Sequence, residues 1–149
     1  MITSVEQFVT EWTQESEQTV RLLSSLTDES LLRRIAPGHW TLGEIAWHLV
    51  GSLHYMTYLG LSFPAPRAEQ PMTAAEILEA YRMISRDMLA AVQTQWGDDS
   101  LQEEREMAGE RWKNGASLRF VLMHQAHHRG QMTVLMRQAG IADIPRMYG

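Results

Sequence analysis

Residues 41–49 read Thr41-Leu42-Gly43-Glu44-Ile45-Ala46-Trp47-His48-Leu49, and they contain the clearest helix start in the chain. Glu44 follows Thr41 at the spacing of a capping box, in which each side chain accepts a hydrogen bond from the other residue's backbone N–H. We therefore predict a helix that begins at Thr41 and runs to about Gly60. The prolines of the stretch Phe63-Pro64-Ala65-Pro66 then force a loop.

Three further helices follow from spacing and capping. Apolar residues recur every three or four positions over residues 4–26, which indicates an amphipathic helix. Thr73 and Glu76 form a second capping box, and the helix that they open ends near Gly97. A last helix is predicted over about residues 116–139.

The connections complete the predicted fold. Residues 98–115 are polar and are expected to form a long loop that can hold a short hairpin. Four helices of about 20 residues indicate an all-α fold, a four-helix bundle. The long connections 60–72 and 98–115 permit a topology other than simple up-and-down. We expect a single domain over residues 1–149.

Composition excludes several classes of protein. The chain has a net charge of −5 with mixed signs and no basic stripe, which speaks against a nucleic-acid partner. No apolar run approaches the ~18 residues of a membrane span. The N-terminus lacks the basic and apolar regions of a signal peptide, and there is no cysteine for a disulfide. We expect a cytoplasmic protein.

The histidines are the candidate metal-binding residues. His124 and His128 are four residues apart, so both imidazoles lie on one face of the last helix, in a sector that we predict to face the core. Gln131 lies one turn further and can hydrogen-bond a ligand ring or a bound water. His127 points toward the edge of this face and is the weaker candidate. His48, on the second helix, is the third candidate ligand, although a lone interior histidine is more often a hydrogen-bonded core residue.

One face of the second helix is polar for a bundle interior. It carries Glu44, His48, Ser52 and Tyr55. Buried polar groups are costly unless they are satisfied, so this stripe predicts a lined cavity, with a solvent-facing stripe as the alternative.

Missing residues narrow the kind of metal site. No histidine has a glutamate three residues before it, which excludes a ferritin-like di-iron site. Position 125 is glutamine, so the His-Glu-x-x-His motif of zinc proteases is absent. Three neutral imidazoles would leave a divalent ion its full charge and an open position. Such an ion lowers the pKa of a bound water or thiol.

Two segments resemble a known family. Residues 37–49 resemble the second-helix motif of the DinB-like (DinB/YfiT) superfamily, and residues 124–131 resemble its fourth-helix motif. The resemblance implies a four-helix bundle, often a homodimer, with nickel or zinc held by three histidines, which by position are His48, His124 and His128. Several relatives transfer a low-molecular-weight thiol such as bacillithiol or mycothiol, and others are isomerases or hydrolases.

Three functions therefore stand as hypotheses. The first is a metal-dependent thiol S-transferase acting on small electrophiles, with Gln131 and Tyr55 orienting ligand or substrate. Arg129 would meet an anionic group of the thiol, or would be a surface residue in a salt bridge. The second is a metal-dependent hydrolase of small molecules with Glu44 as base, although its capping role competes with this. The third is a non-catalytic metal-binding protein.

Overall fold

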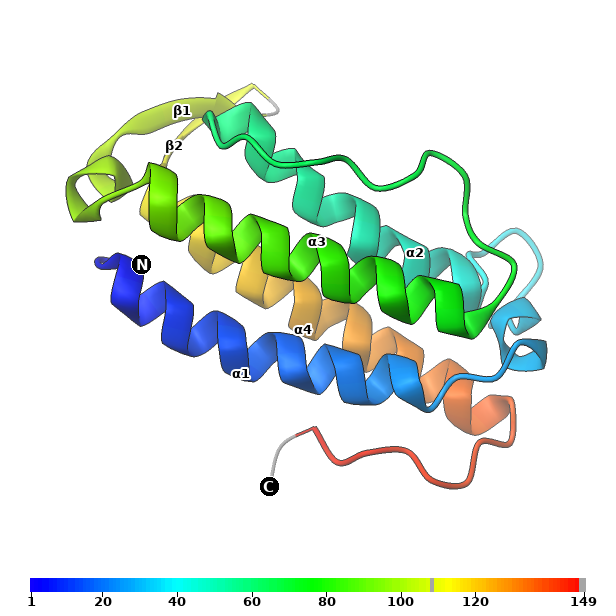
Figure 1. Cartoon of the computed structure of the whole chain (residues 1–149). Coiled ribbons are helices and arrows are strands. Elements are labelled where there is room, and N and C mark those ends of the chain that lie inside the picture. The colour runs from blue at the N-terminus through cyan, green and yellow to red at the C-terminus, as the bar shows by residue number, and fades with distance from the viewer. Residues whose placement is uncertain (108, 148–149) are drawn as a thin grey trace.

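The computed structural model describes residues 1–107 and 109–147 and confirms the all-α four-helix fold (Figure 1). The hairpin expected before the last helix is present and antiparallel. In chain order the elements are α1 (Val5–Ser24), η1 (Glu29–Leu32), α2 (Leu42–Leu53), η2 (His54–Leu59), α3 (Ala74–Gln95), η3 (Asp98–Gln102), β1 (Glu104–Met107), β2 (Glu110–Lys113) and α4 (Asn114–Gln138), where η marks a short 3-10 helix.

The four helices form a bundle in which consecutive helices are not always neighbours. Around the bundle the order is α1, α3, α2, α4, and each helix contacts the two beside it. Figure 1 shows α1 and α3 in front and α2 and α4 behind, with α2 parallel to α3 and antiparallel to α4. The segment between α2 and α3 runs back along the whole bundle, which is why the long connection 60–72 is needed.

The helix starts agree with the capping signals. Thr41 Oγ1 accepts from Glu44 N at 3.1 Å, and Glu44 Oε2 accepts from Thr41 N at 2.6 Å, so the first capping box is complete. Thr73 Oγ1 accepts from Glu76 N at 3.3 Å, but the Glu76 carboxylate accepts from the Thr73 hydroxyl instead of the backbone. The second box is therefore only half formed.

The second helix is shorter than predicted. Its α-helical part ends at Leu53, and the chain continues as the 3-10 helix η2 as far as Leu59. Gly60 then adopts a φ of +94°, a conformation that favours glycine and ends the helical segment near the predicted residue.

The N-terminus is anchored on the start of α4. Ile2 is buried, and its N–H donates to the Gly115 carbonyl at 3.2 Å. The Ile2 carbonyl lies so close to Gly115 that a Cβ at that position would overlap it. Glycine is therefore required here by close backbone approach.

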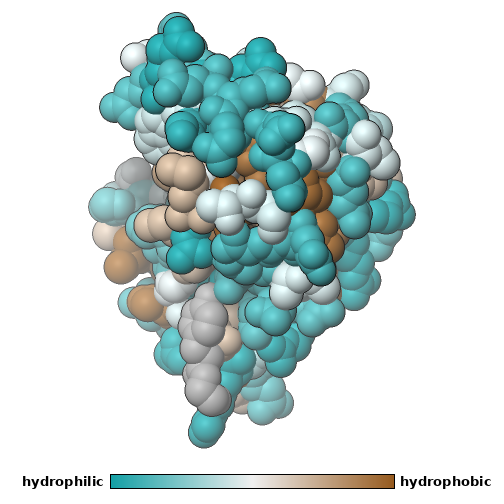
Figure 2. Space-filling view, turned by 90° about the vertical axis from the view of Figure 1, so that its left-hand side faces the viewer, coloured by the Kyte–Doolittle hydropathy of each residue, from teal (hydrophilic) through white to brown (hydrophobic). Residues whose placement is uncertain are grey.

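The interior is apolar and the surface mainly polar. Trp12, Phe8 and Tyr81 are among the largest fully buried side chains. Figure 2 shows that the end of the molecule that carries the hairpin is mostly hydrophilic, with hydrophobic residues in small patches. Across the described residues, no helix has the length and apolar character that a bilayer span requires.

Candidate metal centre

Three histidines from two antiparallel helices meet at one point. His48 lies in the middle of α2, and His124 and His128 lie one turn apart on the neighbouring α4. His124 Nε2 is 3.1 Å from His48 Nε2 and 3.1 Å from His128 Nε2. All three ligand atoms lie within 4.8 Å of one another, so these residues form a group that could hold a metal ion.

The hydrogen bond from Gln131 fixes the chemical form of one ring. His128 Nδ1 lies 2.7 Å from Gln131 Oε1, and an amide oxygen only accepts, so Nδ1 carries the proton. His128 Nε2 then presents a lone pair toward His124 Nε2. This is the tautomer that a metal ligand requires, and it is held by the contact that the sequence predicted for Gln131.

The two Nε2–Nε2 separations of 3.1 Å suit either a hydrogen bond or a shared metal ion, and the number of available protons favours the metal ion. Four ligands placed tetrahedrally at the ~2.0–2.1 Å zinc–nitrogen bond length lie about 3.3 Å apart, which is close to the 3.1 Å found here. A single proton between two Nε2 atoms would satisfy only one pair. A shared cation would satisfy all three atoms.

Electrostatics keep the rings neutral at physiological pH. Burial, and then the neighbouring His128 and His48, lower the pKa of His124 to about 4. Burial also lowers the pKa of His48 and of His128 below the ordinary value. Neutral imidazole is the metal-binding form, so the site is prepared to accept a cation.

Aromatic rings flank the three histidines. The Trp40 ring lies 5.0 Å from the His48 ring and 6.5 Å from the His128 ring, measured between centroids. On the other side, the Phe120 ring lies 5.7 Å from the His124 ring. The imidazoles are therefore held between two apolar walls.

The polar stripe of α2 and η2 lines a cavity at the surface and does not face the bundle interior, because Glu44 and Tyr55 are exposed and His48 and Ser52 are half-buried. Glu44, His48, Ser52 and Tyr55 all border one cavity of about 410 Å³. Glu44 is exposed, and its hydrogen bonds to the Thr41 backbone lower its carboxyl pKa, which makes the carboxylate a cap and a weak base. Glu44 and Tyr55 therefore border the same cavity as His48, one of the three candidate metal ligands.

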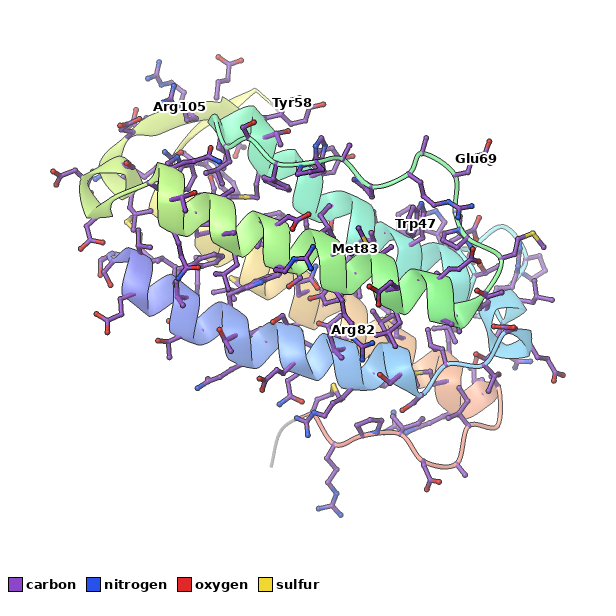
Figure 3. All side chains as sticks on the ribbon, viewed as in Figure 1. Trp47, Tyr58, Glu69, Arg82, Met83 and Arg105 are labelled. Carbon is purple, nitrogen blue, oxygen red and sulfur yellow. The ribbon has the colours of Figure 1, made fainter. Side chains whose placement is uncertain are left out.

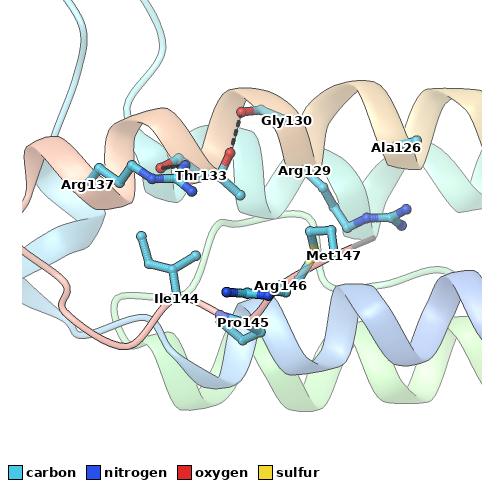
Figure 4. A pocket seen from close by; sticks show the side chains of 9 residues that line it. All are labelled: Ala126, Arg129, Gly130, Thr133, Arg137, Ile144, Pro145, Arg146 and Met147. Carbon is cyan, nitrogen blue, oxygen red and sulfur yellow. Dashed lines mark hydrogen bonds between the residues drawn. The ribbon is translucent and has the colours of Figure 1, made fainter. Parts of the chain in front are cut away.

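Arg129 does not join the group. The prediction of a surface position is wrong, because only 1% of the side chain is exposed. Figure 4 shows it pointing from α4 toward α1, where it forms an ion pair with Glu15 and donates to Thr19 Oγ1 at 2.9 Å. It borders a separate cavity of about 400 Å³ together with Arg137. The predicted salt bridge is confirmed, but it lies in the interior of the bundle.

The histidine sector lies at the edge of the buried face of α4 and not at its centre. His128 is buried, His124 is half-buried and Gln131 is exposed, which corrects the prediction that the whole sector faces the core. His127 is exposed; its ring is 4.9 Å from that of His128 and lies outside the group of three.

The centre of the buried face carries a residue that sequence analysis missed. Gln125 is fully buried; it accepts from Tyr81 Oη at 3.1 Å and donates to the Leu49 carbonyl at 3.4 Å. Gln125 follows His124 and Leu49 follows His48 in the sequence. The hydrogen bond from Gln125 to Leu49 therefore joins α4 to α2 next to the three histidines. The available signal was its place among buried apolar residues at helical spacing, namely Leu118, Leu122, Met132 and Met136.

Fold and site together define a class: a four-helix bundle with a candidate metal centre of three histidines on its second and fourth helices. The chain belongs to the DinB family, whose sequence profile matches residues 1–149. It is 44% identical over 152 residues to the uncharacterized protein YrdA of Bacillus subtilis strain 168, with 100% of this chain and 90% of YrdA covered.

Solved structures agree with this assignment. A DinB-like protein from Bacillus cereus ATCC 10987 superposes with a TM-score of 0.93 at 41% identity, covering 99% of this chain and 100% of that one. YjoA, a DinB-like protein from Bacillus subtilis, gives a TM-score of 0.74 at 15% identity over 95% and 96% of the two chains, and supports the fold alone.

Proposed function

We propose that this protein is a metal-dependent thiol S-transferase. It would bind a divalent ion, nickel or zinc, through His48, His124 and His128, and would transfer a low-molecular-weight thiol of the bacillithiol or mycothiol type to a small electrophile. The observation that carries the proposal is the set of three neutral imidazoles with converging Nε2 atoms, a group that no carboxylate joins in the described part of the chain.

The donor set suits an anionic sulfur ligand. A divalent ion held by three neutral ligands keeps its double charge and would stabilise the thiolate form of a thiol near neutral pH. Gln131 keeps the proton on His128 Nδ1, while Trp40 and Phe120 pack beside the imidazole rings. In the reaction, sulfur bonds to the electrophilic carbon, the leaving group departs with the electron pair of its broken bond, and the thiol proton passes to solvent.

The test uses protein purified without a histidine tag and loaded with nickel or zinc. With bacillithiol and 1-chloro-2,4-dinitrobenzene, we expect thiol-dependent release of chloride that requires the metal and is lost in His128→Ala. His127→Ala is the matched control, because His127 is an adjacent, exposed histidine outside the group, and it should retain activity. No product above the metal-free background with bacillithiol, mycothiol or cysteine would refute the proposal.

A metal-dependent hydrolase is the second candidate, since Glu44 borders the same cavity as His48. The ion would then activate water, with Glu44 as base. Metal-dependent cleavage of p-nitrophenyl acetate without thiol, lost in Glu44→Gln, would favour it. Metal binding that stabilises the fold without either activity would indicate a non-catalytic site.

We also propose that residues 1–149 act as one domain, as a homodimer in the cytoplasm, on a small-molecule substrate. The homodimer follows from the family resemblance, the single domain from the chain length, and the location from the N-terminal sequence and the absence of cysteine. Light scattering of the purified protein measures the oligomeric state, and a monomer at all concentrations would contradict the homodimer.

A further inference from the structure

A second cavity, which Trp40 does not line, adjoins the three histidines and shares Ser52, Tyr55 and Tyr58 with the cavity of the polar stripe. It has a volume of about 440 Å³ and lies between α2 with η2, the strand β2 and the first half of α4. His124 forms part of its wall. The cavity is lined by four aromatic side chains, namely Tyr55, Tyr58, Trp112 and Phe120, and we call it the aromatic cavity.

These rings form two contacting pairs. Trp112 of β2 meets the Phe120 ring edge-on at 5.6 Å, and Tyr55 stacks on Tyr58 at 5.9 Å. Figure 3 shows Tyr58 at the end of the bundle where the hairpin lies, on the outer side of the molecule. Phe120, Tyr55 and Tyr58 are 43%, 55% and 69% exposed, which leaves ring surface available to a ligand.

The polar groups of the lining are already engaged. The Ser52 hydroxyl donates to the Leu49 carbonyl at 3.3 Å, and the Ser117 hydroxyl donates to the Lys113 carbonyl at 3.5 Å. Both are bonds within a helix or at its start. The wall is therefore mainly apolar, and its other polar groups include the tyrosine hydroxyls, the His124 imidazole and the Glu110 carboxylate.

One carboxylate gives the cavity its charge. Glu110 lines it and accepts from Trp112 Nε1 at 2.8 Å, and no lysine or arginine is among the described lining residues. An anionic ligand would meet the Glu110 charge with no lysine or arginine among the described lining residues to compensate it. An uncharged aromatic ring could stack on the side chains without this cost.

We propose that the aromatic cavity binds uncharged aromatic molecules and is the acceptor subsite of the transferase. The second half of this statement rests on the proposed function. The volume lies within the range of small-molecule sites, about 300–1,000 Å³. The contact of Phe120 with His124 brings a bound ring to the edge of the metal group. Glu110 is the specificity residue, because its charge disfavours an anionic group of the ligand beside β2.

The binding test uses unreactive probes on the metal-free protein, so that the charge of an ion at His124 does not act on the probes. 3,5-Dinitrobenzenesulfonamide and 3,5-dinitrobenzenesulfonate have nearly the same shape and differ by one negative charge, and neither has a group that a thiol displaces readily. By calorimetry we expect the neutral probe to bind about ten-fold more tightly than the sulfonate, and Phe120→Ala or Tyr58→Ala to weaken it several-fold. Both positions are exposed, so the variants should fold, and circular dichroism checks this.

The charge test isolates Glu110. Glu110→Gln keeps an oxygen acceptor for Trp112 and removes the charge, so the preference for the neutral probe should shrink to about two-fold. Glu106→Gln is the matched control, because Glu106 is exposed on the other strand of the hairpin and is not among the described lining residues; it should keep the preference. Equal binding of both probes to the unaltered protein would overturn the charge selection.

The outcomes separate the two proposals. Selective binding of the neutral probe without thiol transfer to any acceptor supports the aromatic site and overturns the transferase. Transfer to 1-chloro-2,4-dinitrobenzene with a KM unchanged in both alanine variants overturns the aromatic site as acceptor subsite. If Phe120→Ala converts a dimer to monomers and no probe binds, a second copy of the chain covers the cavity, and the proposal is wrong.

Discussion

Replacing Gln131 tests whether the orientation of one imidazole sets the metal affinity. Gln131 Oε1 accepts the Nδ1 proton of His128 at 2.7 Å and so directs the Nε2 lone pair into the group. Without this acceptor, the ring can turn or move its proton to Nε2. Loss of such a partner costs about 10- to 100-fold in affinity, or about 1.4–2.7 kcal/mol. Gln131→Ala should weaken metal binding by this amount.

Competition with a chromophoric chelator measures the effect, using zinc and protein free of any tag. Gln131→Glu tests the direction of the change in affinity. This variant retains an acceptor and adds a negative charge, so it should bind zinc at least as tightly as the unaltered protein. Gln138→Ala, at the exposed end of the same helix, is the control and should change nothing. Affinity within two-fold in Gln131→Ala would refute the reasoning.

Three further predictions concern stability, and urea unfolding of the metal-free protein checks each. Gly115→Ala should destabilise by about 1–3 kcal/mol, because the new Cβ would displace the backbone at Ile2; unchanged stability would mean that the N-terminus moves freely. Gly130→Ala should stabilise by about 0.5–1 kcal/mol, since a Cβ in this helix meets nothing within 4 Å; a loss would contradict the open space found there. Stability should fall as the pH drops from about 6.5 toward 4, because folding lowers the pKa of His124 from 6.5 to about 4 and the unfolded chain binds more protons in that range; a flat profile would contradict this.

Much of this architecture could be predicted because its signals are local. The capping box of Thr41 and Glu44 placed the start of α2, and hydrophobic spacing placed the other helices. The four-residue spacing of His124 and His128 placed two imidazoles side by side, since one helical turn fixes that geometry. The meeting of these two with His48 depended on the family resemblance, because nothing local to either segment brings α2 beside α4.

What sequence analysis missed depends on neighbours distant in the chain. The burial of Arg129 is set by Glu15 and Thr19 on α1, more than 100 residues earlier. The centre of the α4 core face at Gln125 is set likewise by Tyr81 of α3. A helical wheel shows which residues share a face, but the ring order of the helices decides which face is covered.

The separation of the ligands along the chain has a consequence for biosynthesis. His48 and His124 are 76 positions apart, and the last helix supplies two of the three rings. On the ribosome, the imidazoles cannot assemble until that helix has emerged, so a chain truncated before Asn114 has no complete centre. A bound ion would link the final helix to the second and so close a long loop of the chain, and metal binding would therefore be a late step in forming the native structure.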